Sequence, residues 1–316
     1  MPTRTADLAL LGVAVVWGSS YLATKELATG DTVFGVLAMR FVLAAAALAV
    51  LIGPRLRRVT APELTSGMLC GTVLWAVYAC ETYGVTRTSA CNAGLLMALT
   101  IVVTPLLHGA RGVPARFYAA GSTAVAGCVL LTQAQGFGPP GIGDAVIGAA
   151  AVLRAGHVTL LGRVTAGREL DITRMALVQL ATVAILSVGL ATVTGESVNA
   201  LAGGMSPGDW LLLLYLALAC TVFAFVVQVR AVQRSTPARV SLLLGTEPLW
   251  AAVLGAALAS DPVTAAGVCG AALVVCGTVW GQRLLAPDGR ADIRCQGGVR
   301  KSRRNPAGGI GRNVNY

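Results

Sequence analysis

The second hydrophobic stretch of the chain, residues 34–53, reads FGVLAMRFVLAAAALAVLIG and contains one charged side chain, Arg40. A helix of 20 apolar residues is about 30 Å long, which is the thickness of the hydrocarbon core of a bilayer. Nine similar stretches occur, at residues 7–28, 65–84, 89–109, 114–135, 144–165, 173–194, 209–232, 238–260 and 262–285. The pattern predicts an all-α polytopic membrane protein with ten transmembrane helices.

The composition of the chain excludes several classes of protein. Of its 316 residues, 55% are hydrophobic and 12% are charged, whereas an ordinary soluble domain carries about 25% charged residues. So few polar side chains cannot cover a surface that faces water. A soluble enzyme, a disordered protein and a disulfide-rich secreted domain are therefore poor interpretations.

Positive charge gathers in alternate loops of this topology. Twenty of the 24 Lys and Arg residues lie on the side of the N-terminus, and six acidic residues collect on the other side: Glu26, Asp31, Asp144, Glu196, Asp209 and Asp261. Because cytoplasmic loops carry an excess of Lys and Arg, we expect both termini to be cytoplasmic. Arg outnumbers Lys by 22 to 2, which is typical of a GC-rich bacterial gene and favours a bacterial plasma (inner) membrane.

The last residues, 286–316, are polar, basic and rich in glycine. Such a composition cannot bury enough apolar surface to fold, so we expect a disordered cytoplasmic tail. Its charge either meets anionic lipid headgroups or enforces the topology. Nucleic-acid binding is a poor interpretation of the basic charge, because most of it lies in short loops between apolar stretches.

The two halves of the chain resemble a duplication. Residues 1–135 and 144–285 each contain five stretches, joined by a Gly/Pro-rich linker at residues 136–143. Five crossings per half place the repeats in opposite orientations, a plan that recurs in transporters with the site near the midplane. The fourth and ninth stretches contain Pro105 and Pro248, which we expect to kink their helices and free backbone carbonyls.

Five short motifs occur in order along the stretches: Trp17-Gly18-Ser19-Ser20; Arg40-Phe41; Thr88-Ser89-Ala90 with Ala93 and Pro105; Gln233-Arg234-Ser235-Thr236-Pro237 with Glu247-Pro248; and Gly267, Gly270 and Gly277. With these motifs, residues 7–284 resemble the EamA-type family of the drug/metabolite transporter superfamily. The resemblance implies two five-helix halves, a central cavity, alternating access, and export or exchange of small metabolites, amino acids or drugs. The chain departs from the family pattern at Asp261, where a Gly-Glu pair is common, and at Arg154-Ala155, where Trp-Ala is common. The second departure implies a specialised substrate.

Two charged residues are expected near the middle of the membrane, Arg154 in the sixth stretch and Glu247 in the ninth. A charge at the centre of a transmembrane helix costs about 2.5–3.5 kcal/mol on insertion scales, so it needs a partner or water. One hypothesis joins the two residues in an ion pair within the cavity. In its functional form Arg154 receives an anionic group such as a carboxylate, and Glu247 binds a proton or a cation. The alternatives are a permanent pair that fixes helix packing, or snorkelling toward the lipid.

Other polar residues within the stretches are candidates for the wall of the cavity. Glu81 either lines the cavity or pairs with Arg40 or Arg87 at the outer rim. His157 shares a helix face with Arg154, where it either relays protons or is merely hydrogen-bonded. Trp17, Ser19 and Ser20 either line the cavity or serve close helix packing. The remaining candidates are Arg40 and Gln228.

No catalytic or cofactor motif accompanies these residues. The sequence has no Walker sequence, no HExxH motif, and no CxxC pair or histidine cluster that would ligate a metal. We therefore expect no enzyme activity, no cofactor and no metal site. The cysteines inside the apolar stretches are expected to serve packing.

The function predicted is that of a secondary transporter, an exporter of a small organic solute, either proton-coupled or facilitated. The alternatives are a lipid-carrier flippase, which needs a laterally open apolar groove, and a non-transporting scaffold or sensor, which a collapsed apolar centre favours. The partners are the substrate, protons where transport is coupled, and bilayer lipids. Two Gly-x-x-x-Gly motifs, Gly67–Gly71 and Gly277–Gly281, permit close helix contacts either within one chain or in a homodimer.

Overall fold

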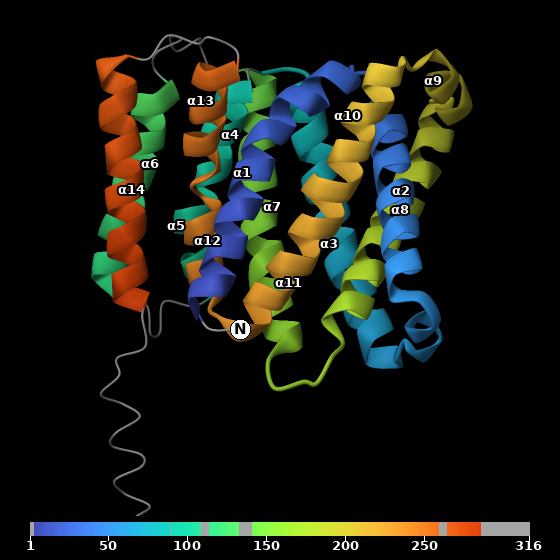
Figure 1. Ribbon diagram of the computed structural model, residues 1–316, viewed down its shortest axis with the longest axis horizontal. Helices are drawn as coiled ribbons and strands as arrows, with labels where there is room; N and C mark the ends of the chain where they lie inside the picture. The colour runs from blue at the N-terminus through green and yellow to red at the C-terminus, as the bar shows by residue number, and fades with distance from the viewer. Residues whose placement is uncertain (1–2, 89, 109–113, 133–140, 259–263, 286–316) are drawn as a thin grey trace, which may run out of the picture. The chain divides into compact units, whose positions relative to one another are not determined.

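The computed structural model describes residues 3–88, 90–108, 114–132, 141–258 and 264–285. Every regular element in these ranges is a helix, and Figure 1 shows the long helices running in a common direction. The predicted tail at residues 286–316, most of the linker and Asp261 lie outside the described residues.

The first half of the described chain holds α1 (Thr3–Leu27), α2 (Val33–Ile52), the 3-10 helix η1 (Gly53–Arg58), α3 (Ala61–Val85), α4 (Ala90–Ala98), α5 (Thr100–His108) and α6 (Ala115–Thr132). The second half holds α7 (Ile142–Thr165), α8 (Ile172–Thr194), α9 (Val198–Gly204), α10 (Pro207–Ala217), the π-helix η3 (Leu218–Phe223), α11 (Ala224–Arg234), α12 (Pro237–Leu244), α13 (Glu247–Leu258) and α14 (Ala265–Leu285). Over the described ranges, seven helices are long and apolar enough to cross a membrane: Thr5–Leu27, Val33–Arg55, Ala61–Val85, Ile142–Thr165, Ile172–Thr194, Pro207–Arg234 and Ala265–Leu284.

Polar residues at the helix ends set where several helices begin. Thr60 and Glu63 form a reciprocal capping box at the start of α3, and Ser206 forms another with Asp209 at the start of α10. The Asp171 side chain accepts from two backbone N–H groups at the start of α8. These bonds satisfy amides that have no partner within the helix.

The surface of the helices is apolar, as contact with lipid requires. Val50, Leu51 and Val193 are 81%, 74% and 80% exposed, whereas Phe41 and Leu180 are fully buried between helices. Exposed apolar side chains at this density would drive a water-soluble protein to aggregate. In a bilayer they contact hydrocarbon instead.

Glycine lets helices of the same chain approach closely at both Gly-x-x-x-Gly motifs. A Cβ atom at Gly67 or Gly71 would lie within 2.7 Å of side-chain atoms of α8, and one at Gly277 would lie 2.6 Å from the backbone of Ala124 in α6. One at Gly281 would lie 2.6 Å from Leu242. Both motifs therefore pack within the chain, so neither supplies an argument for a homodimer.

Two of the predicted stretches are broken into pairs of short helices. The first break, at Leu99, separates α4 from α5, and the second, at Gly245 and Thr246, separates α12 from α13. The two broken helices pack against each other, α5 on α12 and α4 on α13. A Cβ atom at Gly245 would clash with Ile101, so the close approach at this crossing requires glycine.

The α1 helix meets α13 at Gly18. A Cβ atom there would lie 2.8 Å from the carbonyl oxygen of Glu247 and 2.9 Å from the backbone nitrogen of Ala251. The absent side chain therefore fixes how closely Trp17 and its neighbours approach Glu247.

We expect the Gly18→Ala substitution to lower the free energy of unfolding by about 1–3 kcal/mol, because the added methyl group must push two helix backbones apart. The matched control is Gly148→Ala in α7, where a Cβ atom meets nothing within 4 Å. The control should be neutral or slightly stabilising, since alanine favours the helix. Thermal unfolding in detergent compares the two, and equal melting temperatures would contradict this account of the α1–α13 contact.

Candidate transport site

The centre of the site is an ion pair between α3 and α7. These helices pack closely, because a Cβ atom at Gly84 would lie 2.7 Å from Ile147. Glu81 lies almost one turn before Gly84 and faces Arg154. The Nη2 atom of Arg154 donates to the Oε2 atom of Glu81, and the two side chains are 10% and 11% exposed.

The hypothesis of an ion pair between Arg154 and Glu247 has no counterpart among the described residues, although both side chains line one small cavity. The pair that the structure assigns to Arg154 is with Glu81. Glu247 begins α13 rather than lying inside a continuous helix, and its backbone packs on Gly18 of α1.

Aromatic rings hold the Arg154 guanidinium on its other sides. Its central carbon lies 4.6 Å from the centroid of the Trp17 ring and 5.9 Å from that of Tyr78. Arg40 approaches the same Tyr78 ring at 4.9 Å and the Phe41 ring at 5.5 Å. Ring faces attract cations more strongly where water is excluded. Two buried arginines thus share one tyrosine.

The π-helix η3 anchors both Arg40 and Trp17. The Arg40 Nε atom donates to the Thr221 hydroxyl at 2.9 Å, and that hydroxyl donates to the Leu216 carbonyl at 2.8 Å. The Trp17 indole N–H donates to the Cys220 carbonyl at 2.8 Å. A π-helical turn inside an α-helix is rare and frequently marks a functional site. Here it presents a hydroxyl and a carbonyl to the two residues.

A small cavity lies where the two helix breaks meet. Its volume is about 20 Å³, and its lining includes Ala98 and Thr100 from the first break, Gly245 and Glu247 from the second, and Trp17 and Arg154. That volume holds about one water molecule. This conformation therefore has no room for an organic solute beside Arg154, and a solute can enter only if the helices move.

Four charged residues are buried in this region: Arg40, Glu81, Arg154 and Glu247 are 3%, 9%, 8% and 6% exposed. Within the described residues, Glu247 and Arg40 form no ion pair. Ionisable side chains within membrane-spanning segments are expensive, and they mark pathways for substrates or ions. The burial of both signs of charge at one level is therefore the strongest functional signal in the chain.

Comparison with known protein families identifies the chain. A family model described as the EamA-like transporter family matches residues 4–133 and again residues 142–280. The chain belongs to the EamA-like transporter family. The resemblance drawn from the motifs is confirmed, and with it membership of the drug/metabolite transporter superfamily.

A solved structure shares the fold of this chain. A crystal structure described only as "Crystal structure of protein" has a TM-score of 0.71 and 20% sequence identity, over 89% of this chain and 98% of that chain. At this identity the similarity shows the fold alone. No curated protein matches the chain.

The other predicted site residues of this EamA protein lie around the centre without lining the cavity. The Ser20 hydroxyl donates to the Trp17 carbonyl, and Ser19 shares a 2.5 Å hydrogen bond with the Tyr215 hydroxyl. The His157 Nε2 atom bonds the Gln179 amide oxygen at 3.0 Å, and this is the polar contact that the structure gives it. Gln228 is buried in α11 away from the cavity lining.

The two prolines differ in their relation to the helix breaks. Pro248 is the second residue of α13, directly after the break at Gly245. Pro105 lies inside α5, and the interruption is six residues earlier at Leu99. Proline is tolerated in the first turn of a helix, where its missing N–H has no partner to lose. The helix break at Gly245 is thus consistent with the position of Pro248 in the first turn of the next helix. Pro105 lies beyond the first turn of its helix and does not explain the break at Leu99.

Sequence reasoning missed Tyr78 and Thr221, which are central here. Neither carries a charge, and both lie in apolar stretches where a tyrosine or threonine is ordinary. The spacing of Tyr78 and Glu81, three residues apart on one helix face, is the available signal. No feature of the sequence marks the π-helix.

We expect Arg154→Gln and Glu81→Gln each to lower the free energy of unfolding by about 3–5 kcal/mol, because each change leaves an unpaired charge in the bilayer interior. In the double variant the free energy of unfolding should fall by less than the sum of the two single decreases, since neither charge remains in the protein. Thermal unfolding of the four proteins in detergent measures this.

The matched control is the ion pair of Arg239 with Asp7 at 2.6 Å, whose side chains are 16% and 29% exposed at the ends of their helices. Arg239→Gln should cost about 1 kcal/mol or less. Additive effects of the Arg154 and Glu81 changes would contradict a direct pair between them.

Proposed function

We propose that this EamA-family protein is a secondary transporter that moves a small organic solute across the membrane by alternating access. In this proposal the chain crosses the membrane ten times. The crossings are α1, α2, α3, α4 with α5, α6, α7, α8, α10 with η3 and α11, α12 with α13, and α14. Two repeats, residues 1–135 and 144–285, form inverted halves, and the two family matches support this division.

The observation that carries the proposal is the placement of Arg154 beside the crossing of two broken helices. Its guanidinium is held by one carboxylate and two rings, and its Nε atom has no partner among the described residues. A guanidinium binds carboxylates in a two-pronged geometry. An anionic group of a solute therefore has a cation to bind once the cavity widens, in exchange for Glu81 or beside it.

Glu247 is proposed as the coupling residue. It faces the same cavity as Arg154, it is 6% exposed, and it forms no ion pair among the described residues. A proton on this carboxyl removes a buried charge, which is favourable in low dielectric. Binding and release of that proton from opposite sides of the membrane is the simplest way to couple transport to a proton gradient.

The helix breaks are proposed to supply the movement. Interrupted helices bend at low cost because fewer backbone hydrogen bonds must be broken. The cavity of about 20 Å³ makes this conformation a closed one. Rocking about the breaks at Leu99 and Gly245 would open the space beside Arg154 to one side or the other.

The direction and location of transport are also proposals. Figure 1 places the start of α1 at the same end as the end of α2, the start of α8 and the end of α11. Arg55, Arg174 and Arg230 therefore lie at the N-terminal end of α1. The positive-inside rule makes this end cytoplasmic, and export from a bacterial plasma membrane is the direction that the family resemblance implies.

The two alternatives fit the centre of the molecule less well. A scaffold or sensor has no need for four buried charged residues at one level. A lipid-carrier flippase needs an apolar path to the centre. The large cavity on the side of this protein has an apolar part and a charged part, and its lining includes none of Arg154, Glu81 and Glu247.

We expect everted membrane vesicles to show proton movement on addition of a transported compound, read with a pH-sensitive dye. The panel comprises amino acids, organic anions and cationic drugs. The Glu247→Gln substitution should abolish the signal, because the neutral amide cannot carry the proton. Glu26→Gln, at an exposed helix end, is the matched control and should leave it intact.

Proton movement that persists in Glu247→Gln would exclude Glu247 as the proton carrier. If no compound moves protons, counterflow of radiolabelled members of the same panel decides between facilitated transport and none. The absence of counterflow for every compound would contradict the transporter proposal.

A further inference from the structure

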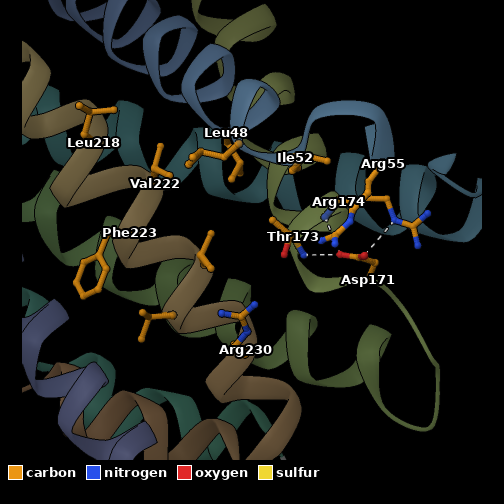
Figure 2. Close-up of a pocket in the computed structure, with 13 residues that line it drawn as sticks. Leu48, Ile52, Arg55, Asp171, Thr173, Arg174, Leu218, Val222, Phe223 and Arg230 are labelled. Carbon is orange, nitrogen blue, oxygen red and sulfur yellow. Dashed lines mark hydrogen bonds and ion pairs between the residues drawn. The ribbon is translucent and has the colours of Figure 1, made fainter. Parts of the chain in front are cut away.

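A second and much larger cavity lies away from the central site, on the side of the helices. Its volume is about 580 Å³, and it runs between α2, the start of α8, and the segment η3–α11. Figure 2 shows Leu218, Val222 and Phe223 along one part, Arg55 and Arg174 beside Asp171 at another, and Arg230 apart from those two on the same segment as Phe223. We call this cavity the lateral groove. Its volume is in the range of small-molecule sites.

The apolar part of the lateral groove opens to the lipid. Leu51, Leu218 and Phe223 line it and are 74%, 46% and 44% exposed. From Leu218 to Arg230 the wall follows about 18 Å of helix. A groove of this length and chemistry fits a hydrocarbon chain that lies along the helices, not across them.

The charged part of the groove carries more positive than negative charge. Arg55, Arg174 and Arg230 line it, together with one acid, Asp171. Asp171 is already bound, because it accepts from the backbone N–H groups of Thr173 and Arg174 and pairs with the Arg174 guanidinium at 3.4 Å. Arg174 also pairs with Glu63 at 3.0 Å.

Arg55 and Arg230 form no ion pair among the described residues. Arg55 lies in η1, three residues after the end of α2, and Arg230 lies one turn before the end of α11. Both therefore lie at the arginine-rich end of the helices, at the depth where headgroups meet hydrocarbon. Two cations without a carboxylate, above an apolar channel, are complementary to a phosphate that carries an acyl chain.

We propose that the lateral groove is a binding site for one anionic phospholipid of the leaflet at the arginine-rich end. The phosphate is bound by Arg55 and Arg230, and one acyl chain lies along Leu48, Val222 and Val226. Basic pockets between transmembrane helices on the cytoplasmic side suit such headgroups. The lipid would contact the π-helix next to Thr221, the residue that holds Arg40.

The test measures retained lipid directly and does not depend on transport. The full chain is delipidated in detergent and incubated with equal amounts of phosphatidylglycerol and phosphatidylcholine of the same chain length. Native mass spectrometry then counts bound lipid. We expect phosphatidylglycerol to bind selectively, with one tightly retained molecule per chain. In the double variant Arg55→Gln/Arg230→Gln, the fraction of protein that retains this lipid should fall at least five-fold.

The matched control is Arg234→Gln, an exposed arginine one turn from Arg230 on the same helix that does not line the groove. It should retain the lipid. Val226→Trp, which fills the apolar part and leaves the arginines in place, should lose it. Melting temperatures near the wild-type value establish that each variant is folded.

Three results would overturn the proposal. The first is equal retention of the two lipids by the wild-type chain. The second is a loss in Arg234→Gln as large as in the double variant, which would indicate diffuse attraction to the basic face. The third is displacement of the lipid by soluble glycerol 3-phosphate, which would make the site one for free phosphate.

Discussion

The arrangement of this protein depends on one constraint, the cost of burying a guanidinium inside a membrane. Arg154 meets that cost with a carboxylate from α3 and ring faces from α1 and α3. Three helices must therefore converge at one level. Gly84 brings α3 onto α7 and Gly18 brings α1 onto α13. These close approaches exist because charges in low dielectric are stabilised only by partners at contact distance.

The irregular parts of the helices serve the same centre. The π-helix positions the Thr221 hydroxyl for Arg40 and the Cys220 carbonyl for Trp17. One turn of backbone therefore holds both the second arginine and the ring that covers Arg154. The two helix breaks meet beside Arg154 and leave Glu247 facing the cavity. Irregular backbone inside a membrane is tolerated only where protein or water satisfies it. Its concentration here, together with buried charge of both signs, separates this region from ordinary helix packing.

Much of the fold follows from the sequence because the membrane limits the choices. Apolar stretches of about 20 residues and alternating loop charge led to a helical membrane protein, and the motifs led to the EamA-like family, which is confirmed. Position within a stretch also predicts similar depths for Arg154 and Glu247, and both line one small cavity. The partners of these residues could not be predicted in this way. Glu81 and Arg154 lie in different stretches, and which face of α3 meets α7 depends on the close approach at Gly84, one glycine among 38. The central roles of Tyr78 and Thr221 depend on tertiary contacts that single-stretch patterns do not encode.

Alternating access requires the closed cavity beside Arg154 to open in turn to both sides of the membrane. The most direct measurement places a single cysteine at Ser241, which lines that cavity and is 1% exposed, in a chain whose native cysteines are replaced. Its reaction with a membrane-impermeant thiol reagent is followed in right-side-out and in everted vesicles. Ser187→Cys, fully buried in α8 away from the cavity, is the control and should react from neither side. We expect Ser241→Cys to react from both sides. Reaction from one side alone, or from neither, would exclude alternating access at this cavity.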